Sequence, residues 1–344
     1  MINSSKDIRS FQFPVLVADI GGTNTRFALV TDAHADIQTF DAVKTNAYDS
    51  LGDAISDTVL NHTALLPRTA VVAVAGPVHG DEIPMTNANW VIEPKKLIEE
   101  LGLNAVVVLN DFEAQALALP TLDEADLTQI GGGEAIRHAP KCVIGPGTGL
   151  GAASLFHAAD FWVPVAGEGG HVEVGPINEE EETVWAELRK KERRIGAEVI
   201  LSGGGLLRLA AAVSDAQGIK TTYSKPSDVT DAADAGDELA RKVLHIFANV
   251  LGRVAGDMAL ILLARGGVYL AGGIPPQIRN YLMDGSLRAG FENKAPHEAI
   301  MKEIPVYLVH HERPALQGLA ALARTPARFA VDLVGRMWQS ESPR

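Results

Sequence analysis

The chain has 344 residues, of which 47% are hydrophobic and 21% charged, and this composition excludes a globally disordered protein. Its formal net charge of −13 argues against a broad basic surface for nucleic acid or an anionic membrane, and the single cysteine, Cys142, excludes an intramolecular disulfide and a multi-cysteine zinc site. Residues 1–7 lack the order of a signal peptide, and the most apolar stretch, 254–274, is broken by charges and glycines. We therefore expect a soluble, cytoplasmic protein.

The first third of the chain predicts alternating strands and helices. An apolar run closed by Asp19 reads as a buried strand, and the turn at 21–24 joins it to a second strand as a hairpin. The expected strands span 15–18, 26–30, 69–75 and 105–109, and the expected helices span 48–61, 97–101 and 112–119. This alternation is typical of an α/β protein with parallel or mixed sheets.

A second unit of the same kind begins near residue 141. Its opening, a strand, a Gly-Thr-Gly turn at 147–149 and another strand, repeats the opening at 15–30, which suggests two similar α/β halves. We place the boundary between about 111 and 140 and expect the last helix to pack back on the first unit. Asn178 should cap a helix whose first residues are glutamates. Further strands are expected at 141–144, 152–157, 268–271 and 305–310, and helices at 238–264 and 314–323.

Three glycine-rich turns follow predicted strands, at 21–24, 145–151 and 272–273. Glycine lets backbone N–H groups approach a phosphate closely, and Thr23 and Thr148 add hydroxyl donors. The turns lack the Gly-Lys-Ser/Thr of a Walker A loop. Residues 147–152 match the dinucleotide pattern G-x-G-x-x-A, but a strand rather than a helix is expected next, so a nicotinamide cofactor is a minor alternative. Together the turns favour a nucleoside triphosphate site.

Asp19 ends a buried strand beside the first of these turns. A lone buried carboxylate is unfavourable without a partner, and Mg²⁺ with its waters is a suitable one. A hydrogen bond from Arg26 or Thr25 is the structural alternative.

Longer motifs, taken in chain order, narrow the choice of protein family. They are DIGGTN at 19–24, AGPV at 75–78, MTNANW at 85–90, LNDF at 109–112, GPGTGLG at 145–151, GEGGHV at 167–172, AEVILSG at 197–203, VYLAGG at 268–273 and IPVYL at 304–308. The combination resembles the bacterial glucokinase family, the non-ROK branch of the actin/hexokinase ATPase superfamily, over residues 14 to 325. Gly204 replaces a proline common in that family. The resemblance leaves the N-terminal extension and the tail after Thr325 unexplained.

The resemblance implies an α/β, two-domain actin-like ATPase (ribonuclease H-like) fold, with duplicated mixed sheets flanked by helices and an interdomain cleft. The small domain would comprise 14–112 plus 315–335, and the large domain 113–314. By the same likeness we expect a homodimer, and from the net charge we expect no binding to nucleic acid or membrane.

The implied activity is ATP-dependent phosphorylation of D-glucose to glucose 6-phosphate and ADP, the first step of glycolysis. By this resemblance Asp111 is the base that accepts the proton of the 6-hydroxyl. The glucose ligands would be Asn110, Glu168, His171 and Glu198. ATP would be held by Asp19, Gly21, Gly22, Thr23, Gly147, Thr148, Gly149, Gly272 and Gly273, with Asp19 also binding Mg²⁺ through water.

Several alternatives stay open. Asp111 is also a suitable N-cap for the helix at 112–119. His171 could form part of a metal site with Glu168 or Glu173, although no cysteine or second nearby histidine completes one. A kinase of the same fold could act on another hexose. A non-catalytic sugar-sensing regulator would need a DNA-binding helix-turn-helix, for which the segment before Val15 leaves no room. For an enzyme, we expect glucose to favour closure of the domains.

Overall fold

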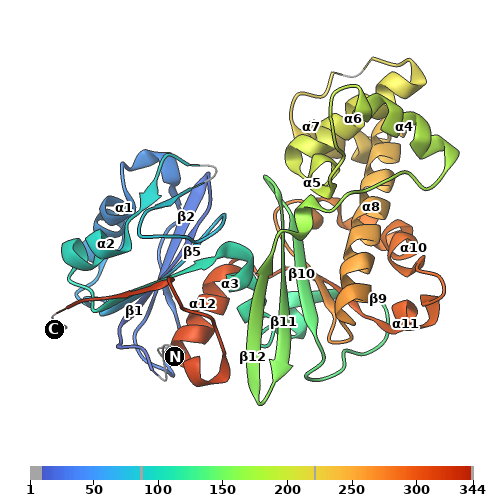
Figure 1. Cartoon of the computed structure of the whole chain (residues 1–344). Coiled ribbons are helices and arrows are strands. Elements are labelled where there is room, and N and C mark those ends of the chain that lie inside the picture. Colours follow the sequence, from blue (N-terminus) through green and yellow to red (C-terminus); the bar gives the residue numbers. More distant parts are fainter. Residues whose placement is uncertain (1–9, 86–87, 221, 342–344) are drawn as a thin grey trace. The chain divides into compact units, whose positions relative to one another are not determined.

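The computed structural model describes residues 10–85, 88–220 and 222–341. Thr86 and Asn87, from the motif at 85–90, lie outside the described residues. The chain forms two compact units, drawn in Figure 1. The first unit comprises 1–122, 155–166 and 312–344, and the second comprises 123–154 and 167–311. The division into domains at 112 and 314 stays a prediction.

The first unit is built on a seven-stranded mixed sheet of order β15-β8-β5-β1-β2-β3, with β4 also pairing β2. Strands β1, β5 and β8 are parallel, and β1 and β2 form the predicted antiparallel hairpin. The strands are β1 (Val15–Ile20), β2 (Asn24–Val30), β3 (Gln38–Thr39), β4 (Val43–Lys44), β5 (Thr69–Val74), β8 (Ala105–Asn110) and β15 (Met337–Gln339). A separate hairpin joins β6 (Ile83–Pro84) and β7 (Val91–Ile92).

The central strands of this sheet are apolar at nearly every position, as is typical of strands that are buried on both faces. Helices cover the sheet and bury these side chains. Helices α1 (Leu51–Thr58) and α2 (Pro94–Leu101) share one core cluster with the sheet. Helix α12 (Pro314–Arg324) packs on α3 (Asp111–Ala118) and on β1, β2 and β5, so the expected return of the last helix is confirmed. Helix α1 is shorter than predicted, because Ser50 caps it by accepting the Asp53 N–H.

The second unit contains a six-stranded sheet of order β12-β11-β10-β13-β14-β9. Strands β10, β13 and β14 are parallel, and β9 pairs antiparallel with β14. Residues 155–166 of the β11–β12 hairpin group with the first unit. The strands are β9 (Leu127–Gly131), β10 (Lys141–Pro146), β11 (Leu150–Ala158), β12 (Phe161–Gly167), β13 (Val268–Leu270) and β14 (Val306–Val309). The strand expected after the second glycine turn, β11, is therefore confirmed.

Helix α8 is the core element of the second unit. It is long and apolar enough to cross a membrane by composition, but two thirds of that window (67%) is buried, as in the core helix of a globular protein. It packs closely on α10 at Gly252 and Gly256. The helices are α4 (Glu179–Arg189), α5 (Ala197–Ile200), α6 (Gly203–Gln217), α7 (Pro226–Asp234), α8 (Glu238–Leu262), α9 (Arg279–Met283), α10 (Ser286–Glu292) and α11 (Glu298–Glu303). The mixed α/β class expected from the sequence, with two sheets flanked by helices, is confirmed.

Candidate active site

In the first unit, predicted site residues lie along one edge of the sheet. Ile20 is in register with Val74, and Val74 is in register with Asn110, so β1, β5 and β8 end at the same level. Asp19 and Asn110 are separated by one intervening strand, a span of roughly 10 Å. Because ligands of open α/β sheets gather at the carboxyl ends of parallel strands, this edge is a suitable place for chemistry.

Asp19 lies opposite Arg26 in the β1–β2 hairpin. The Arg26 guanidinium is 3.5 Å from Asp19 Oδ2, so the expected structural partner is present, whereas the Thr25 hydroxyl bonds Thr45 instead, at 3.0 Å. Burial raises the pKa of Asp19, and the charge and hydrogen bond of Arg26 oppose that rise. The side chain remains 18% exposed, and the Arg26 contact engages Oδ2, which leaves Oδ1 to accept from another donor.

The glycine turn after β1 is held in place by one buried residue, Thr45. Its hydroxyl donates to the Gly21 carbonyl at 2.8 Å, and its backbone N–H donates to the Thr23 carbonyl at 3.1 Å. The Gly21 N–H closes the turn on the Asn24 carbonyl at 3.0 Å. The side chain of Thr23 is exposed at the tip of this turn, where it can meet a ligand.

Asn110, not Asp111, caps helix α3, so the alternative role of Asp111 as N-cap is wrong. The Asn110 side-chain oxygen accepts from the N–H groups of Phe112 at 2.9 Å and Glu113 at 3.2 Å. Asp111 occupies the first helical position, half-buried, and its Oδ1 accepts from Phe112 N–H at 2.9 Å. Asn110 Nδ2 also donates to the Gly76 carbonyl at 3.3 Å. A carboxylate in the first turn interacts favourably with the helix dipole.

In the second unit, the two remaining glycine turns meet. They follow β10 and β13, which are parallel neighbours. Gly272 has φ +85°, and a Cβ there would lie 2.5 Å from the Pro146 carbonyl oxygen, so this position requires glycine. The Gly203 N–H, in the first turn of α6, donates to the Gly147 carbonyl at 2.8 Å. The backbone around Gly147, Thr148, Gly149, Gly272 and Gly273 thus forms one continuous rim.

Glu168 precedes a single 3₁₀ turn, Gly169–His171, and His171 ends it, which places the two residues on the same side of the loop. Their side chains are 72% and 57% exposed, and His171 Nε2 lies 3.7 Å from Glu168 Oε2. A Cβ at Gly170 would lie 1.9 Å from the Leu150 carbonyl oxygen, so the loop fits against β11 with a glycine there. Two exposed polar side chains on a fixed turn are suited to binding a hydroxylated ligand.

A buried ion pair stabilises the segment that follows this loop. Arg253 of α8 pairs with Glu181 of α4 at 3.1 Å, and Arg253 also donates to the Gly175 carbonyl at 2.9 Å. The indole of Trp185 donates to the Val174 carbonyl at 2.8 Å. These contacts fix the segment that follows His171, and Arg194 holds the His171 carbonyl itself at 2.9 Å.

Glu198 connects the sugar-binding candidates to the phosphate-binding candidates. It lies in α5, and its carboxylate accepts from the Leu150 N–H at 2.8 Å. A Cβ at Gly149 would lie 2.6 Å from the same Glu198 oxygen, which explains the glycine at that position. Glu198 therefore contacts the backbone beside the glycine rim, and the loop of Glu168 and His171 packs on the same residue, Leu150, through Gly170.

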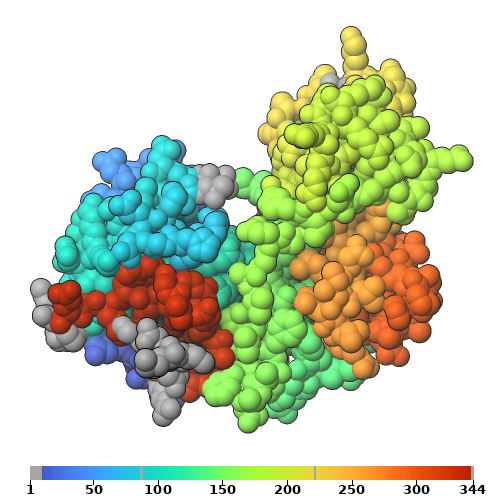
Figure 2. All heavy atoms as spheres, in the orientation of Figure 1, coloured from blue at the N-terminus to red at the C-terminus, as the bar shows by residue number. Residues whose placement is uncertain are grey.

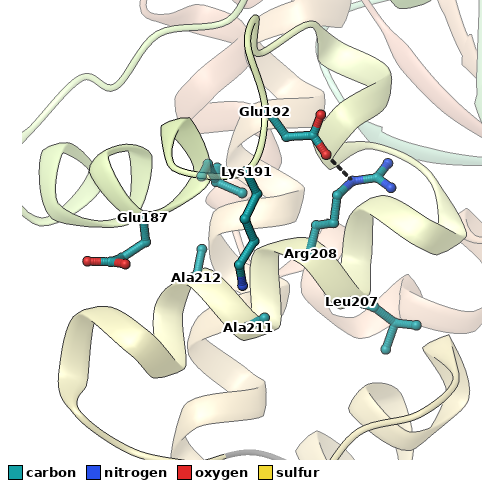
Figure 3. Close-up of a pocket in the computed structure, with 8 residues that line it drawn as sticks. Glu187, Lys191, Glu192, Leu207, Arg208, Ala211 and Ala212 are labelled. Atoms are coloured by element: carbon teal, nitrogen blue, oxygen red, sulfur yellow. Dashed lines mark ion pairs between the residues drawn. The ribbon is translucent and has the colours of Figure 1, made fainter.

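A separate hollow of about 210 Å³ lies between α4 and α6. Figure 3 shows Lys191 extended beside Ala211 and the ion pair of Arg208 with Glu192, whose atoms are 3.8 Å apart. None of the predicted site residues lines this hollow. Within residues 10–85, 88–220 and 222–341, we find no group of three or more His, Cys, Asp or Glu side chains arranged for a metal ion.

The sequence did not identify the residues that support the site. Thr45, Glu113 and Arg253 are buried, and each contacts the backbone of a predicted site loop or its flank. One signal was present for Glu113, because Asn110-Asp111-Phe112-Glu113 has the spacing of a capping box. Thr45 and Arg253 are distant in sequence from the loops they hold, so local patterns carry no signal for them.

Comparisons with known proteins place this geometry in a family. The Glucokinase family model matches residues 16–326. The glucokinase of Brucella abortus biovar 1 (strain 9-941) is 49% identical over 332 residues, covering 96% of this chain and 97% of the relative. The crystal structure of a glucokinase from an Antarctic psychrotroph has a TM-score of 0.82 and 32% identity, covering 91% of this chain and 99% of that one.

A more distant structure shares the fold alone. It is the ROK family glucokinase of Streptomyces griseus in complex with glucose and AMPPNP, with a TM-score of 0.60 and 21% identity, covering 90% of this chain and 99% of that one. The model match and the close relatives span nearly the whole chain, and they confirm the resemblance seen in the motifs. The chain belongs to the glucokinase family.

Proposed function

We propose that this chain transfers the γ-phosphoryl group of ATP to the 6-hydroxyl of D-glucose, releasing glucose 6-phosphate and ADP. The observation that carries the proposal is the carboxyl end of the first sheet, where the Asp19 turn and the Asn110-Asp111 pair follow two strands, β1 and β8, that are separated only by β5. The separation of roughly 10 Å leaves room for a phosphoryl group and a sugar hydroxyl. Family membership supports the same reaction.

Asp111 is the base in this proposal. Phosphoryl transfer needs positioning, charge stabilisation and a group that orients the attacking hydroxyl and accepts its proton. The Asp111 carboxylate is half-buried at the start of α3, where capping by Asn110 fixes the backbone. General base catalysis by one such group is typically worth about 10²–10⁴-fold in rate.

The sugar would be held by amide, imidazole and carboxylate groups. Asn110 uses its oxygen for the cap and one N–H for the Gly76 carbonyl, so its second N–H remains for a sugar hydroxyl. Glu168 and His171 present exposed side chains from one turn. Glu198 retains a carboxylate oxygen beyond the one that accepts from Leu150. Each hydroxyl of a pyranose is both donor and acceptor, which suits this set.

The glycine turns would bind the phosphates of ATP. In the first unit these are Gly21, Gly22 and Thr23, and in the second Gly147, Thr148, Gly149, Gly272 and Gly273. Asp19 fits a magnesium ion bound through water, since it is a partly exposed carboxylate with an oxygen outside its Arg26 contact. Mg²⁺ would supply neutralisation of the phosphate charge, and Asp19 would orient its waters. We further propose a cytoplasmic homodimer, by likeness to the family.

A coupled assay for glucose 6-phosphate tests the proposal. ATP, ADP and polyphosphate are compared as donors with glucose, and mannose, fructose and N-acetylglucosamine are compared as acceptors with ATP. We expect the highest kcat/KM for ATP with glucose, and no turnover when magnesium is removed with a chelator. A higher kcat/KM for another hexose would establish the alternative of a kinase for that sugar, and absence of turnover with every pair would contradict a kinase.

A further inference from the structure

The C-terminal tail lies beyond residue 326, where the match to the family model ends. It returns to the first sheet as strand β15, which pairs antiparallel with β8 so that Met337 faces Val107 and Gln339 faces Ala105. The Val108 N–H donates to the Arg336 carbonyl at 3.0 Å. Figure 1 shows this tail in red, and Figure 2 shows it at the surface of the first unit against its cyan residues. The tail thus adds an edge strand to the strand that ends at Asn110.

The tail is anchored rather than loosely laid on the surface. Trp338 is only 9% exposed and packs in the core cluster of the first unit. Its indole N–H donates to the Asp81 carboxylate at 2.7 Å. Phe329 is also buried. These contacts fix the position of Arg336, which lies between them in the sequence.

Arg336 forms an ion pair with Glu113, the third residue of α3. The distance between Arg336 Nη1 and Glu113 Oε2 is 2.6 Å, and Glu113 is only 2% exposed. The other amino group of Arg336 donates to the Asp332 carbonyl. Burial raises the pKa of Glu113, and the charge and hydrogen bond of Arg336 oppose that rise. The guanidinium is therefore the main group that opposes the effect of burial on this carboxyl.

Glu113 connects this ion pair to the candidate active site. Its backbone N–H donates to the Asn110 side-chain oxygen at 3.2 Å, as part of the cap of α3. A continuous chain of polar contacts therefore runs from Arg336 through Glu113 to Asn110, the residue before Asp111.

We propose that Arg336 is a positioning residue, which holds the Asn110-Asp111 backbone for phosphoryl transfer by way of the Glu113 carboxylate. The tail thereby becomes part of the catalytic scaffold. This inference rests on the proposed function, because it assigns to Arg336 an effect on the proposed base. Displacement of a catalytic group by about 1 Å can reduce the rate about 10²-fold, so loss of this support should be visible in kcat.

The test compares Arg336→Gln with three variants. Arg336→Lys keeps a cation beside Glu113, the double variant Arg336→Gln/Glu113→Gln removes the unpaired buried carboxylate, and Arg328→Gln removes an exposed arginine of the same tail. The measurements are kcat, the KM for glucose and for ATP, and hydrogen exchange of residues 110–113. Unfolding midpoints show whether each variant is folded at the assay temperature.

We expect Arg336→Gln to lower kcat about 10-fold or more, with a KM for ATP within twofold of wild type and faster exchange at 110–113. Arg336→Lys and the double variant should recover much of kcat, and Arg328→Gln should match wild type. A folded Arg336→Gln with kcat within twofold of wild type, or a double variant no better than the single one, would overturn the inference. If Arg336→Gln does not fold, the kcat values of Arg336→Lys and of the double variant are compared with that of wild type by the same criteria.

The proposed function fails in a different manner. If wild type does not phosphorylate glucose, the assignment of Asp111 is wrong whatever the variants do. Faster exchange at residues 110–113 in folded Arg336→Gln would then still report the structural link, and unchanged exchange would remove that link as well.

Discussion

Glu168 is the residue whose side chain tests the sugar assignment most cleanly. It is 72% exposed, and its carboxylate lies near the His171 imidazole of the same turn, so its replacement should leave the fold intact. Glu168→Gln should raise the KM for glucose at least about 10-fold, because a carboxylate–hydroxyl hydrogen bond is worth roughly 1.5–3 kcal/mol. The KM for ATP should stay unchanged in steady-state kinetics.

A matched control lies in the same loop. Glu173 is 73% exposed and pairs with Arg194 at 3.6 Å. Glu173→Gln should therefore leave both Michaelis constants close to wild type. If Glu168→Gln instead raised the KM for ATP and not that for glucose, the sugar pocket would be wrongly assigned.

Lys141 gives a residue-scale prediction for pH. Its amine donates to the Gly266 carbonyl at 2.8 Å and to the Tyr269 hydroxyl at 3.1 Å, and burial lowers its pKa to about 8. Between about pH 8 and the ordinary pKa of 10.5, the folded protein holds fewer protons here than the unfolded chain. The free energy of unfolding should therefore rise with pH in that window, and below about pH 8 this contribution should be constant.

The comparison with Lys141→Met isolates this effect. Urea unfolding at pH 7.5 and 9.5 should show the stability of wild type relative to Lys141→Met increasing by about 1–2 kcal/mol. An unchanged difference between the two proteins at the two pH values would show that burial does not lower the pKa of Lys141.

At the residue scale, a motif indicates candidate residues but does not fix the local role of each. The motif at 109–112 indicated Asn110 and Asp111 together, but which of the two caps the helix depends on backbone geometry. Asn110 is still extended at φ −70° and ψ 148°, so it can cap the helix, and Asp111 already lies within it. A shift of one residue in the helix start would exchange the two roles, and a sequence pattern does not resolve one residue.

At the element scale, the contact of α12 with α3 depends on one glycine. A Cβ at Gly318 would lie 1.9 Å from the Ala114 carbonyl oxygen and 2.8 Å from the Ala118 N. Gly318→Ala should destabilise the protein by about 1–3 kcal/mol, because the helices must separate although alanine favours the helical state. Thermal or urea unfolding measures the change.

Gly204 provides the opposite case in the first turn of α6. A Cβ there would meet only the end of the Arg208 side chain, at 3.4 Å or more. Gly204→Ala should therefore leave the free energy of unfolding unchanged or increase it by up to about 1 kcal/mol. If both substitutions had the same effect, close packing would not be the reason for the glycine in α12.

The elements that the sequence predicted are those with long apolar periods. The central strands and α8 were found because burial alone requires their patterns. Helix α6 was not predicted, since it begins with Gly203, Gly204 and Gly205, and its start depends on the Ser202 hydroxyl that accepts the Gly205 N–H. The short strand β15 was also missed, because three residues become a strand only through pairing with β8.

At the scale of the whole molecule, the proposed glucose ligands are divided between the two units. Asn110 and Asp111 belong to the first, and Glu168, His171 and Glu198 belong to the second. Glucose that contacts both sets should slow amide exchange in 110–113 and in 167–172, while β13 in the core stays unchanged. Hydrogen exchange with and without glucose measures this, with ATP absent.

The same experiment tests whether glucose binds both sets of residues. Slower exchange confined to one of the two segments would contradict the division of ligands. A hydrolysis control without sugar accompanies it, because a site completed by the correct acceptor should hydrolyse ATP very slowly in its absence. Rapid sugar-free hydrolysis would also argue against such assembly.

The family, the order of motifs and the class of fold could be predicted because they depend on short segments that follow strands. The grouping of residues 155–166 with the first unit could not, since the beginning of the same hairpin belongs to the second unit. That grouping depends on contacts such as the bridge between Trp162 and Phe329, which are 167 positions apart by their residue numbers. Long-range contacts of this kind leave no local periodicity.

The central claim is that Asp111 accepts the proton of the glucose 6-hydroxyl, and one substitution tests it most directly. In Asp111→Asn the amide keeps hydrogen-bonding capacity but cannot take up the proton. We predict that kcat falls about 10²–10⁴-fold, while the dissociation constant for glucose, measured by calorimetry, stays within a few-fold of wild type. A folded Asp111→Asn enzyme with near-wild-type kcat would contradict the account.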